Sequence, residues 1–143
     1  MAVVGNTRRL YITDANGTTN TVIKGEQSNS LNRSLSPIEV TDKDTVWQTF
    51  LAGKRGATAD ATFNLDSSAG EKQHDLLKAL HQGSKVFCFV GTVSGQNGAT
   101  RTEGDAFEAL VVAVNDTSEQ EAVASRQVSL QVSGEVTHVP AFT

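Results

Sequence analysis

The chain has 143 residues, a net charge of −4 and a single cysteine, and this length is typical of one domain that buries a hydrophobic core of its own. Hydrophobic residues make up 38% and charged residues 20%, which is typical of a soluble globular protein rather than a disordered one. The acidic balance argues against a protein that grips nucleic-acid phosphates, and the lone Cys88 excludes an internal disulfide and a multi-cysteine metal site. We expect one domain over residues 1–143, made in a cytoplasm without a signal peptide or membrane anchor, because no apolar stretch has the required length.

The first forty residues predict a hairpin, an ambiguous segment and a short strand. RRLYIT (8–13) and TVIK (21–24) are typical of paired strands, and Asn16-Gly17 between them favours a tight turn with positive φ. The polar stretch GEQSNSLNRSLSP (25–37) leaves both a solvated strand and a loop open. IEVT (38–41) indicates a short strand.

A short helix is expected over residues 45–52. Asp42 or Asp44 would cap its N-terminus, and Gly53 would end it. Its apolar residues would share one face: Val46, Trp47, Phe50 and Leu51.

The middle of the chain gives the clearest patterns. Residues 57–66 (ATADATFNLD) alternate between apolar and polar, as in a half-buried strand. The following segment predicts a helix up to Gly83, with a capping box made by Ser68 and Glu71. Its buried stripe would consist of Leu76, Leu77 and Leu80.

The last sixty residues predict three strands and one long loop. Residues 85–93 and 106–114 are apolar on both faces, the Gly-rich polar stretch 94–105 indicates a loop, and 126–139 alternates. The whole pattern predicts a mainly β (α+β) fold, an antiparallel β-sandwich or small barrel of about seven or eight strands with one flanking α-helix. Because one helix cannot cover several strands with two apolar faces, we expect neighbouring subunits to complete the sheets.

No residue pattern indicates catalysis, a cofactor or a metal site. His74 and His81 lie seven residues apart on the expected helix, too far to hold one zinc ion, and His138 follows the last strand. The carboxylates of Glu39, Asp42 and Asp44 do not share a face of any regular element, and no nucleophile–base pair is apparent. DANG (14–17) fails as a calcium loop because its twelfth position is Gly25. We expect a protein that is not an enzyme.

One segment carries a family resemblance. SPIEVTDKDTVWQTFLAGKRGATADATFNL (36–65) holds an acidic start, the only Trp, a basic end and an alternating strand, and VIKGEQSNSLNRS precedes it. In this order the chain resembles the major tail proteins, or tail tube proteins, of long-tailed, siphovirus-type bacteriophages. The order of the later elements agrees, so the resemblance extends over nearly the whole chain.

The resemblance implies a tail-tube-like β-sandwich whose subunits form hexameric rings. These would stack into the tail tube of a virion, around the tape-measure protein and between the tail terminator and baseplate proteins, with synthesis in the host bacterial cytoplasm. DNA would pass through transiently at infection, and six chains at −4 would give roughly −24 per ring, which discourages DNA from sticking. We expect residues 26–36 and the polar faces of the alternating strands to line the channel.

Two surfaces are expected to contact other subunits. In the first, apolar anchors would be surrounded by a polar rim, and its residues are Asp42, Lys43, Asp44, Trp47, Phe50, Leu51, Lys54 and Arg55. The alternative is that Trp47 packs inside its own subunit. The second surface is an inter-ring contact in the expected loop 94–105, made by Gln96, Asn97, Arg101 and Glu103.

Other functions remain open at this stage. The tube of a type VI secretion system or of a gene-transfer agent shares the ring-and-tube principle. A stand-alone β-sandwich module that binds carbohydrate belongs to a different class and is disfavoured, because most aromatic residues lie in apolar runs.

Overall fold

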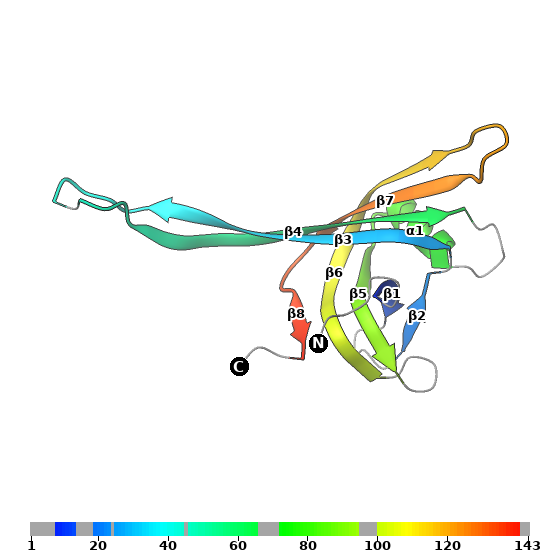
Figure 1. Ribbon diagram of the computed structural model, residues 1–143, viewed down its shortest axis with the longest axis horizontal. Coiled ribbons are helices and arrows are strands. Elements are labelled where there is room, and N and C mark those ends of the chain that lie inside the picture. The colour runs from blue at the N-terminus through cyan, green and yellow to red at the C-terminus, as the bar shows by residue number, and fades with distance from the viewer. Residues whose placement is uncertain are drawn as a thin grey trace.

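One antiparallel sheet and one helix form the part of the chain that the structure, a computed structural model, describes: residues 8–13, 19–23, 25–44, 46–65, 72–94 and 100–140. Figure 1 shows the sheet curled into a body, from which one long hairpin projects. The elements are β1 (Arg9–Thr13), β2 (Asn20–Val22), β3 (Glu26–Glu39), β4 (Phe50–Asn64), α1 (Lys72–Gln82), β5 (Lys85–Ser94), β6 (Thr100–Thr117), β7 (Ser125–Val132) and β8 (Thr137–Val139).

The strands follow the order β2-β1-β5-β6-β7-β4-β3, and β8 pairs with β6. Every pairing is antiparallel. The sheet curls so far that the start of β3 reaches β1: the Glu26 carboxylate accepts a hydrogen bond from the Leu10 amide at 3.0 Å, and the Asn29 side-chain amide donates to the Arg8 carbonyl at 3.2 Å. The predicted fold class, mainly antiparallel β with one flanking helix, is confirmed.

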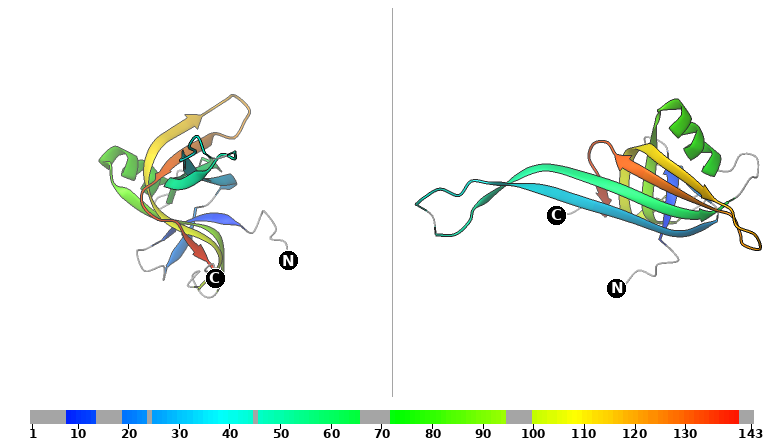
Figure 2. Two further views of the ribbon diagram at one scale, coloured as in Figure 1. Left: turned by 90° about the vertical axis from the view of Figure 1, so that its left-hand side faces the viewer. Right: turned by 90° about the horizontal axis from the view of Figure 1, so that it is seen from above.

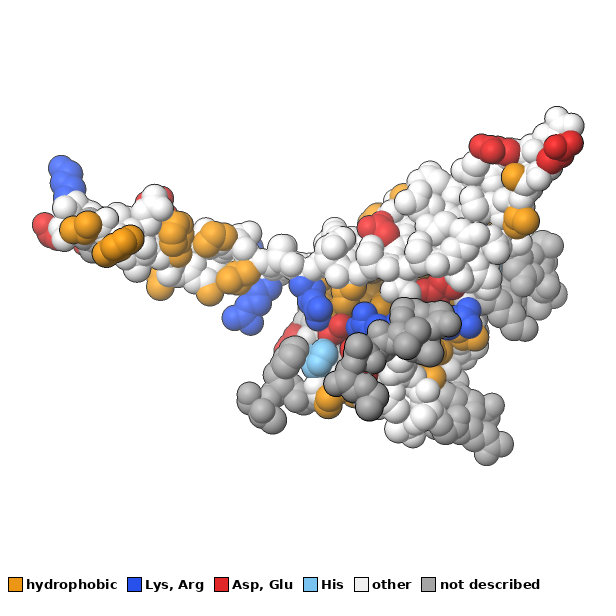
Figure 3. Space-filling model, in the orientation of Figure 1, with side chains coloured by type: hydrophobic (Ala, Val, Ile, Leu, Met, Phe, Trp, Pro, Cys, Tyr) orange, Lys and Arg blue, Asp and Glu red, His pale blue; other side chains and the backbone are white. Residues whose placement is uncertain are grey.

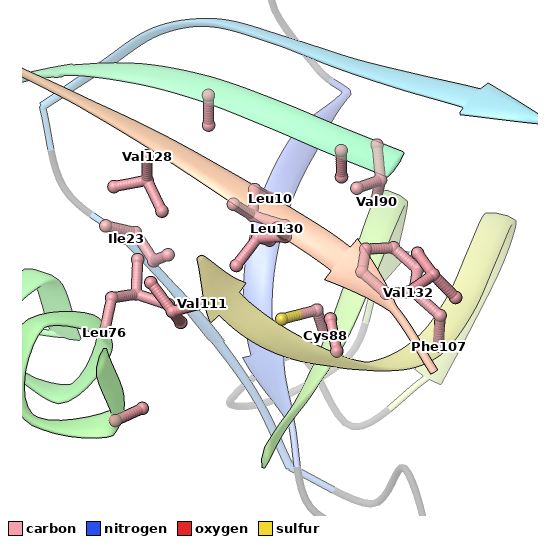
Figure 4. Packing of buried hydrophobic residues seen from close by; sticks show 14 of the residues in the cluster. Leu10, Ile23, Leu76, Cys88, Val90, Phe107, Val111, Val128, Leu130 and Val132 are labelled. Atoms are coloured by element: carbon pink, nitrogen blue, oxygen red, sulfur yellow. The ribbon is translucent and has the colours of Figure 1, made fainter. Parts of the chain in front are cut away.

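A single hydrophobic cluster fills the curled sheet and extends beneath the helix. The alternation predicted for residues 57–66 is confirmed over 57–64, since Ala57, Ala59, Ala61 and Phe63 are all buried, whereas Leu65 follows the strand and is exposed. Helix α1 lies against β6 and adds Leu76, which is fully buried. Figure 4 shows how side chains from the helix and from several strands meet here, among them Leu10, Ile23, Leu76, Cys88, Val90, Phe107, Val111, Val128, Leu130 and Val132.

The projecting hairpin, residues 34–44 and 46–56, is called the arm below. Figures 1 and 2 show that its two strands run side by side away from the body, with α1 on the far side of the body from the arm tip. Near the tip Ile38 pairs with Leu51 and Glu39 with Phe50. Beyond these strands the Val40 amide donates to the Thr49 carbonyl at 2.8 Å, so the turn keeps backbone hydrogen bonds of its own.

The helix expected over residues 45–52 is wrong, because residues 50–52 lie in β4 and 46–49 in the turn of the arm. An eight-residue helix is marginal unless its apolar stripe packs on a core, and no described residue of the body covers Val46 and Trp47, which are 95% and 84% exposed. Gly53 therefore does not end a helix. It lies beside a β-bulge between Leu35 and Pro37, where a Cβ atom would come within 2.3 Å of the Ser36 carbonyl oxygen.

The observed bounds of other elements also differ from the predicted ones. Residues 26–37 form a strand that runs on through Glu39, so IEVT is not a strand of its own. The expected loop 94–105 is wrong for Ser94, which ends β5, and for residues 100–105, which begin β6. The expected final strand 126–139 is divided into β7 and β8. The helix is confirmed over Lys72–Gln82. Its capping box and the Asn16-Gly17 turn lie outside the described residues.

Candidate subunit interfaces

The arm carries most of the exposed apolar surface of the described chain. Seven of the eleven large hydrophobic side chains that are exposed lie on it, and Val46 and Trp47 are the most exposed, at 95% and 84%. The alternative that Trp47 packs inside its own subunit is therefore wrong. Apolar patches of this kind mark sites of contact with another molecule. The seven are Leu35, Ile38, Val40, Val46, Trp47, Phe50 and Leu51.

The charged residues expected in one polar rim lie at two ends of the arm. Asp42, Lys43 and Asp44 lie in the turn at the tip, whereas Lys54 and Arg55 lie toward the body, where Arg55 pairs with Leu35. At ~3.3 Å per residue, the two groups are separated by up to roughly 30 Å. All five are exposed, and Figure 3 shows hydrophobic side chains along the arm between them. The arm therefore has two distinct charged ends.

A buried carboxylate fixes the base of the arm to the body. Asp105 of β6 is 1% exposed, and its Oδ1 accepts from Arg33 Nη1 at 2.8 Å and lies 3.0 Å from His138 Nδ1. Its Oδ2 lies 3.6 Å from Arg8 Nη2. Asp105 thus connects β3, β6, β8 and the start of the chain, a cluster that sequence patterns did not indicate because its members are far apart in the chain.

The residues of the expected inter-ring loop have different places. Arg101 and Glu103 lie in β6 and are engaged within their own chain: the Arg101 guanidinium stacks 5.0 Å from the Phe89 ring centroid, and Glu103 Oε2 accepts from Arg8 Nε at 3.0 Å. Gln96 and Asn97 lie outside the described residues, so for them an inter-ring contact stays a prediction.

Among the open sheet edges of the described residues, two lie on either side of β7 and β4. One is the outer edge of β3, which pairs with β4 alone and reaches β1 only through side chains. The other is the end of β6: β5 pairs with β6 only as far as Leu110, whereas β7 pairs as far as Thr117. Between these edges, β6, β7, β4 and β3 form a four-stranded sheet.

The outer face of this four-stranded sheet is polar and almost uncharged. One complete row of side chains crosses it from Ser28 through Thr62 and Gln127 to Asn115. The next row contains Asp60, whose Oδ1 accepts from the Ser129 hydroxyl at 2.9 Å. Glu26, which was expected among the channel residues, is buried on the other face and bonds to β1.

The described residues show no arrangement suited to metal binding or thiol chemistry. Within them, no group of three or more His, Cys, Asp or Glu side chains could hold a metal ion. His74 and His81 are exposed on α1, and His138 contacts Asp105. Burial raises the pKa of Cys88 to about 12, which keeps this thiol protonated. No helix in the described part of the chain is long and apolar enough to span a membrane.

Comparison with known proteins gives matches only at the level of structure. No protein-family model and no curated protein matches the chain. The tail of an empty gene transfer agent particle, solved with C6 symmetry, matches with a TM-score of 0.78 at 14% identity over 96% of this chain and 99% of that one. The SPP1 tail tube matches with 0.72 at 13% identity, over 93% and 77%. The tube-terminating cap of the anti-feeding prophage matches with 0.65 at 14% identity, over 96% and 92%.

These likenesses extend over nearly the whole chain, while the identities are too low to show more than the fold. The chain has the same fold as these phage-tail and tail-like tube structures.

Proposed function

We propose that the chain is a structural subunit of a phage-type tail tube, in which six copies form a ring and rings stack. The fold that it shares with the SPP1 tail tube and with the C6-symmetric gene transfer agent tail supports this proposal. It assigns the chain no catalytic role, and it places the chain in a virion tail after synthesis in the host cytoplasm.

The two open edges of the four-stranded sheet carry the proposal. Because neighbouring strands alternate in direction, β3 of one copy would run antiparallel to the end of β6 in the next copy. Six copies of four strands would then close into a barrel of about 24 strands. Closure would pair both of these edges, which otherwise invite uncontrolled aggregation.

The polar outer face of the sheet would line the channel of such a barrel. Its many hydroxyl and amide side chains would give passing DNA or a tape-measure protein little apolar surface to adhere to. Asp60 would contribute one carboxylate per subunit, repeated around each ring, and this negative charge repels DNA phosphates.

The arm would make contacts between subunits outside the channel. Trp47, Phe50 and Leu51 are exposed on it, and aromatic side chains often supply much of the binding free energy at interfaces. The further partners that we propose are a tape-measure protein, a tail terminator and baseplate proteins.

A tube subunit of a related particle is the second candidate. Structures of a gene transfer agent and of the anti-feeding prophage match the chain as well. In this second candidate function the subunits would also form rings that stack into a tube, but the tube would belong to a tail-like particle other than a phage.

Hydrogen exchange tests the proposed closure. In the free subunit, amides at the open edges, within 28–34 and 112–117, exchange rapidly, whereas amides of 88–90 in β5 are protected. In the assembled form, the edge amides become protected at least roughly 100-fold, because opening then requires separation of paired strands. Assembly that leaves both edges unprotected contradicts the proposed barrel.

A further inference from the structure

A groove lies where the arm leaves the body. Its volume is about 640 Å³, and it separates the arm from the segment between β7 and β8. Figure 3 shows Lys and Arg side chains gathered near this base of the arm. The residues that matter here are Leu35 and Arg55 on the arm and Glu135 and Val136 on the opposite wall.

The groove offers two unpaired charges beside apolar surface. The side chains of Arg55 and Glu135 make no ion pair or hydrogen bond with the described residues. Arg33, which also lines the groove, is already engaged by Asp105. The groove therefore presents one free cation and one free anion around an apolar floor.

The arm tip has the complementary composition. Val46 and Trp47 are its most exposed hydrophobic residues. Neither Lys43 nor the carboxylate of Asp44 forms an ion pair with the described residues, and the backbone amide of Asp44 donates to Asp42 Oδ1 at 3.0 Å. The tip thus presents one free anion and one free cation around an aromatic centre.

We propose that the arm tip of one copy docks into this groove of a second copy. Trp47 packs on Leu35 and Val136, Asp44 pairs with Arg55, and Lys43 pairs with Glu135. The proposal rests on the proposed tube function, which brings copies of the chain together. It adds the surface of the second copy to which the arm tip binds.

The shape of the arm means that the contact forms between two copies and repeats from each copy to the next. Tip and groove lie at opposite ends of one stiff hairpin, so a chain cannot occupy its own groove. Two different surfaces that bind each other form a heterologous contact, which propagates from copy to copy. The spacing between successive copies along the arm is then at most roughly 30 Å, at ~3.3 Å per residue from Leu35 to Asp44.

Charge reversal at the two ends tests the contact. Asp44→Lys and Arg55→Glu, made singly, are each expected to lower the equilibrium constant for assembly at least roughly tenfold, equivalent to about 1.4 kcal/mol. The double variant restores it to within roughly threefold, because the pair is re-formed with its charges exchanged. Sedimentation of assembled protein, checked by electron microscopy, measures the effect.

Two matched controls carry the same charge changes on exposed sites away from the arm. Glu119→Lys lies in the loop after β6, and Lys78→Glu lies on α1. Both are expected to assemble like the original chain. Circular dichroism confirms that all variants fold, as expected for exposed positions.

The fluorescence of Trp47, the only tryptophan, separates this proposal from the proposed function. Docking moves the indole from water into the groove, so its emission shifts to the blue as concentration rises, and each single reversal abolishes the shift. Tubes that form without this shift, or single reversals that assemble like the controls, overturn the docking contact and leave the tube function intact. A reversible shift that follows the charge exchange but never yields rings or tubes supports the contact and overturns the function. Unchanged monomers contradict both.

Discussion

Asp105 is the residue on which the attachment of the arm depends most. Three cationic or ionisable partners, Arg8, Arg33 and His138, converge on one carboxylate that water does not reach. Buried hydrogen bonds to charged groups are worth more than surface ion pairs, and this cluster connects β3 to the body where the arm begins.

Asp105→Asn is therefore expected to lower the free energy of unfolding by about 1–3 kcal/mol, because the two arginines lose their counter-charge. Urea denaturation measures the loss. Glu103→Gln removes a partly exposed partner of Arg8 and should cost less than about 1 kcal/mol. Equal losses in the two variants would contradict the central position of Asp105.

The buried thiol of Cys88 is expected to make the free energy of unfolding depend on pH in the alkaline range. Burial raises its pKa from 9.0 to about 12, so between these values the folded chain keeps a proton that the unfolded chain releases. Its contribution to stability is complete below pH 9 and is lost as pH rises toward 12. Burial raises the pKa of Tyr11 as well, which adds to the loss above pH 10.

Urea titrations from pH 8 to pH 11 check this dependence. The free energy of unfolding should fall with pH above 9, and the slope should be shallower in Cys88→Ala, whatever that variant costs at pH 8. An unchanged slope would mean that Cys88 does not carry the effect.

Trp47 illustrates what residue patterns settle and what they leave open. Its apolar neighbours and the charges around it indicate a contact surface, but a periodic pattern does not say whether an apolar face meets its own core or another molecule. Whether Trp47 can reach the core of its own chain depends on the pairing of β3 with β4, which extends the arm away from the body.

At the scale of elements, the arm is expected to act in assembly and not in folding. Trp47→Ala should change the free energy of unfolding by no more than about 0.5 kcal/mol, since the side chain is 84% exposed, yet it should abolish or strongly reduce assembly. Thermal unfolding and sedimentation measure the two effects. Val123→Ala, another exposed apolar truncation, is the control, and a Trp47→Ala chain that unfolds or that assembles normally would contradict the assignment.

The crossing of β5 and β6 depends on two facing glycines. Gly91 pairs with Gly104, which has φ +143°, and a Cβ on Gly104 would lie 2.6 Å from Gly91 Cα. Gly104→Ala should cost about 1–3 kcal/mol of stability. Gly56→Ala, where no atom lies within 4 Å, should stay within about 0.5 kcal/mol. Equal stability of the two variants in urea would mean that the close approach is not required.

Strong periodic patterns identified elements well, and short apolar runs did not. Residues 57–64 and the helix over Lys72–Gln82 have the predicted type because each buries one regular face. Residues 45–52 do not, because local spacing suits a helix face while the chain gains more from pairing Ile38 with Leu51 and Glu39 with Phe50. Such cross-strand partners are so far apart in the sequence that a local residue pattern does not indicate their pairing.

At the scale of the whole molecule, composition and element order predicted the fold class but not the separation of the charges on the arm. In the sequence the charged residues of 36–65 lie close together. The extended hairpin separates them, because Asp42 and Asp44 lie at the tip with Trp47, whereas Lys54 and Arg55 lie near the body. The groove at the base also needs Glu135 and Val136, which come from the far end of the chain. Only the folded sheet brings these residues together.

The same sheet explains why the isolated chain is expected to associate. An open edge of β3, an open end of β6 and an exposed apolar arm are liabilities for a free monomer. The proposed ring would cover both edges, and the proposed stacking would cover the arm, so one assembly would remove all three liabilities.

Electron microscopy of the purified full-length protein over rising concentration tests this account most directly. We predict six-fold rings that stack into tubes with a central channel, with β3 of each subunit beside β6 of its neighbour in the reconstructed wall. A dispersed monomer at high concentration, or a tube whose channel is lined by another face of the subunit, would contradict it.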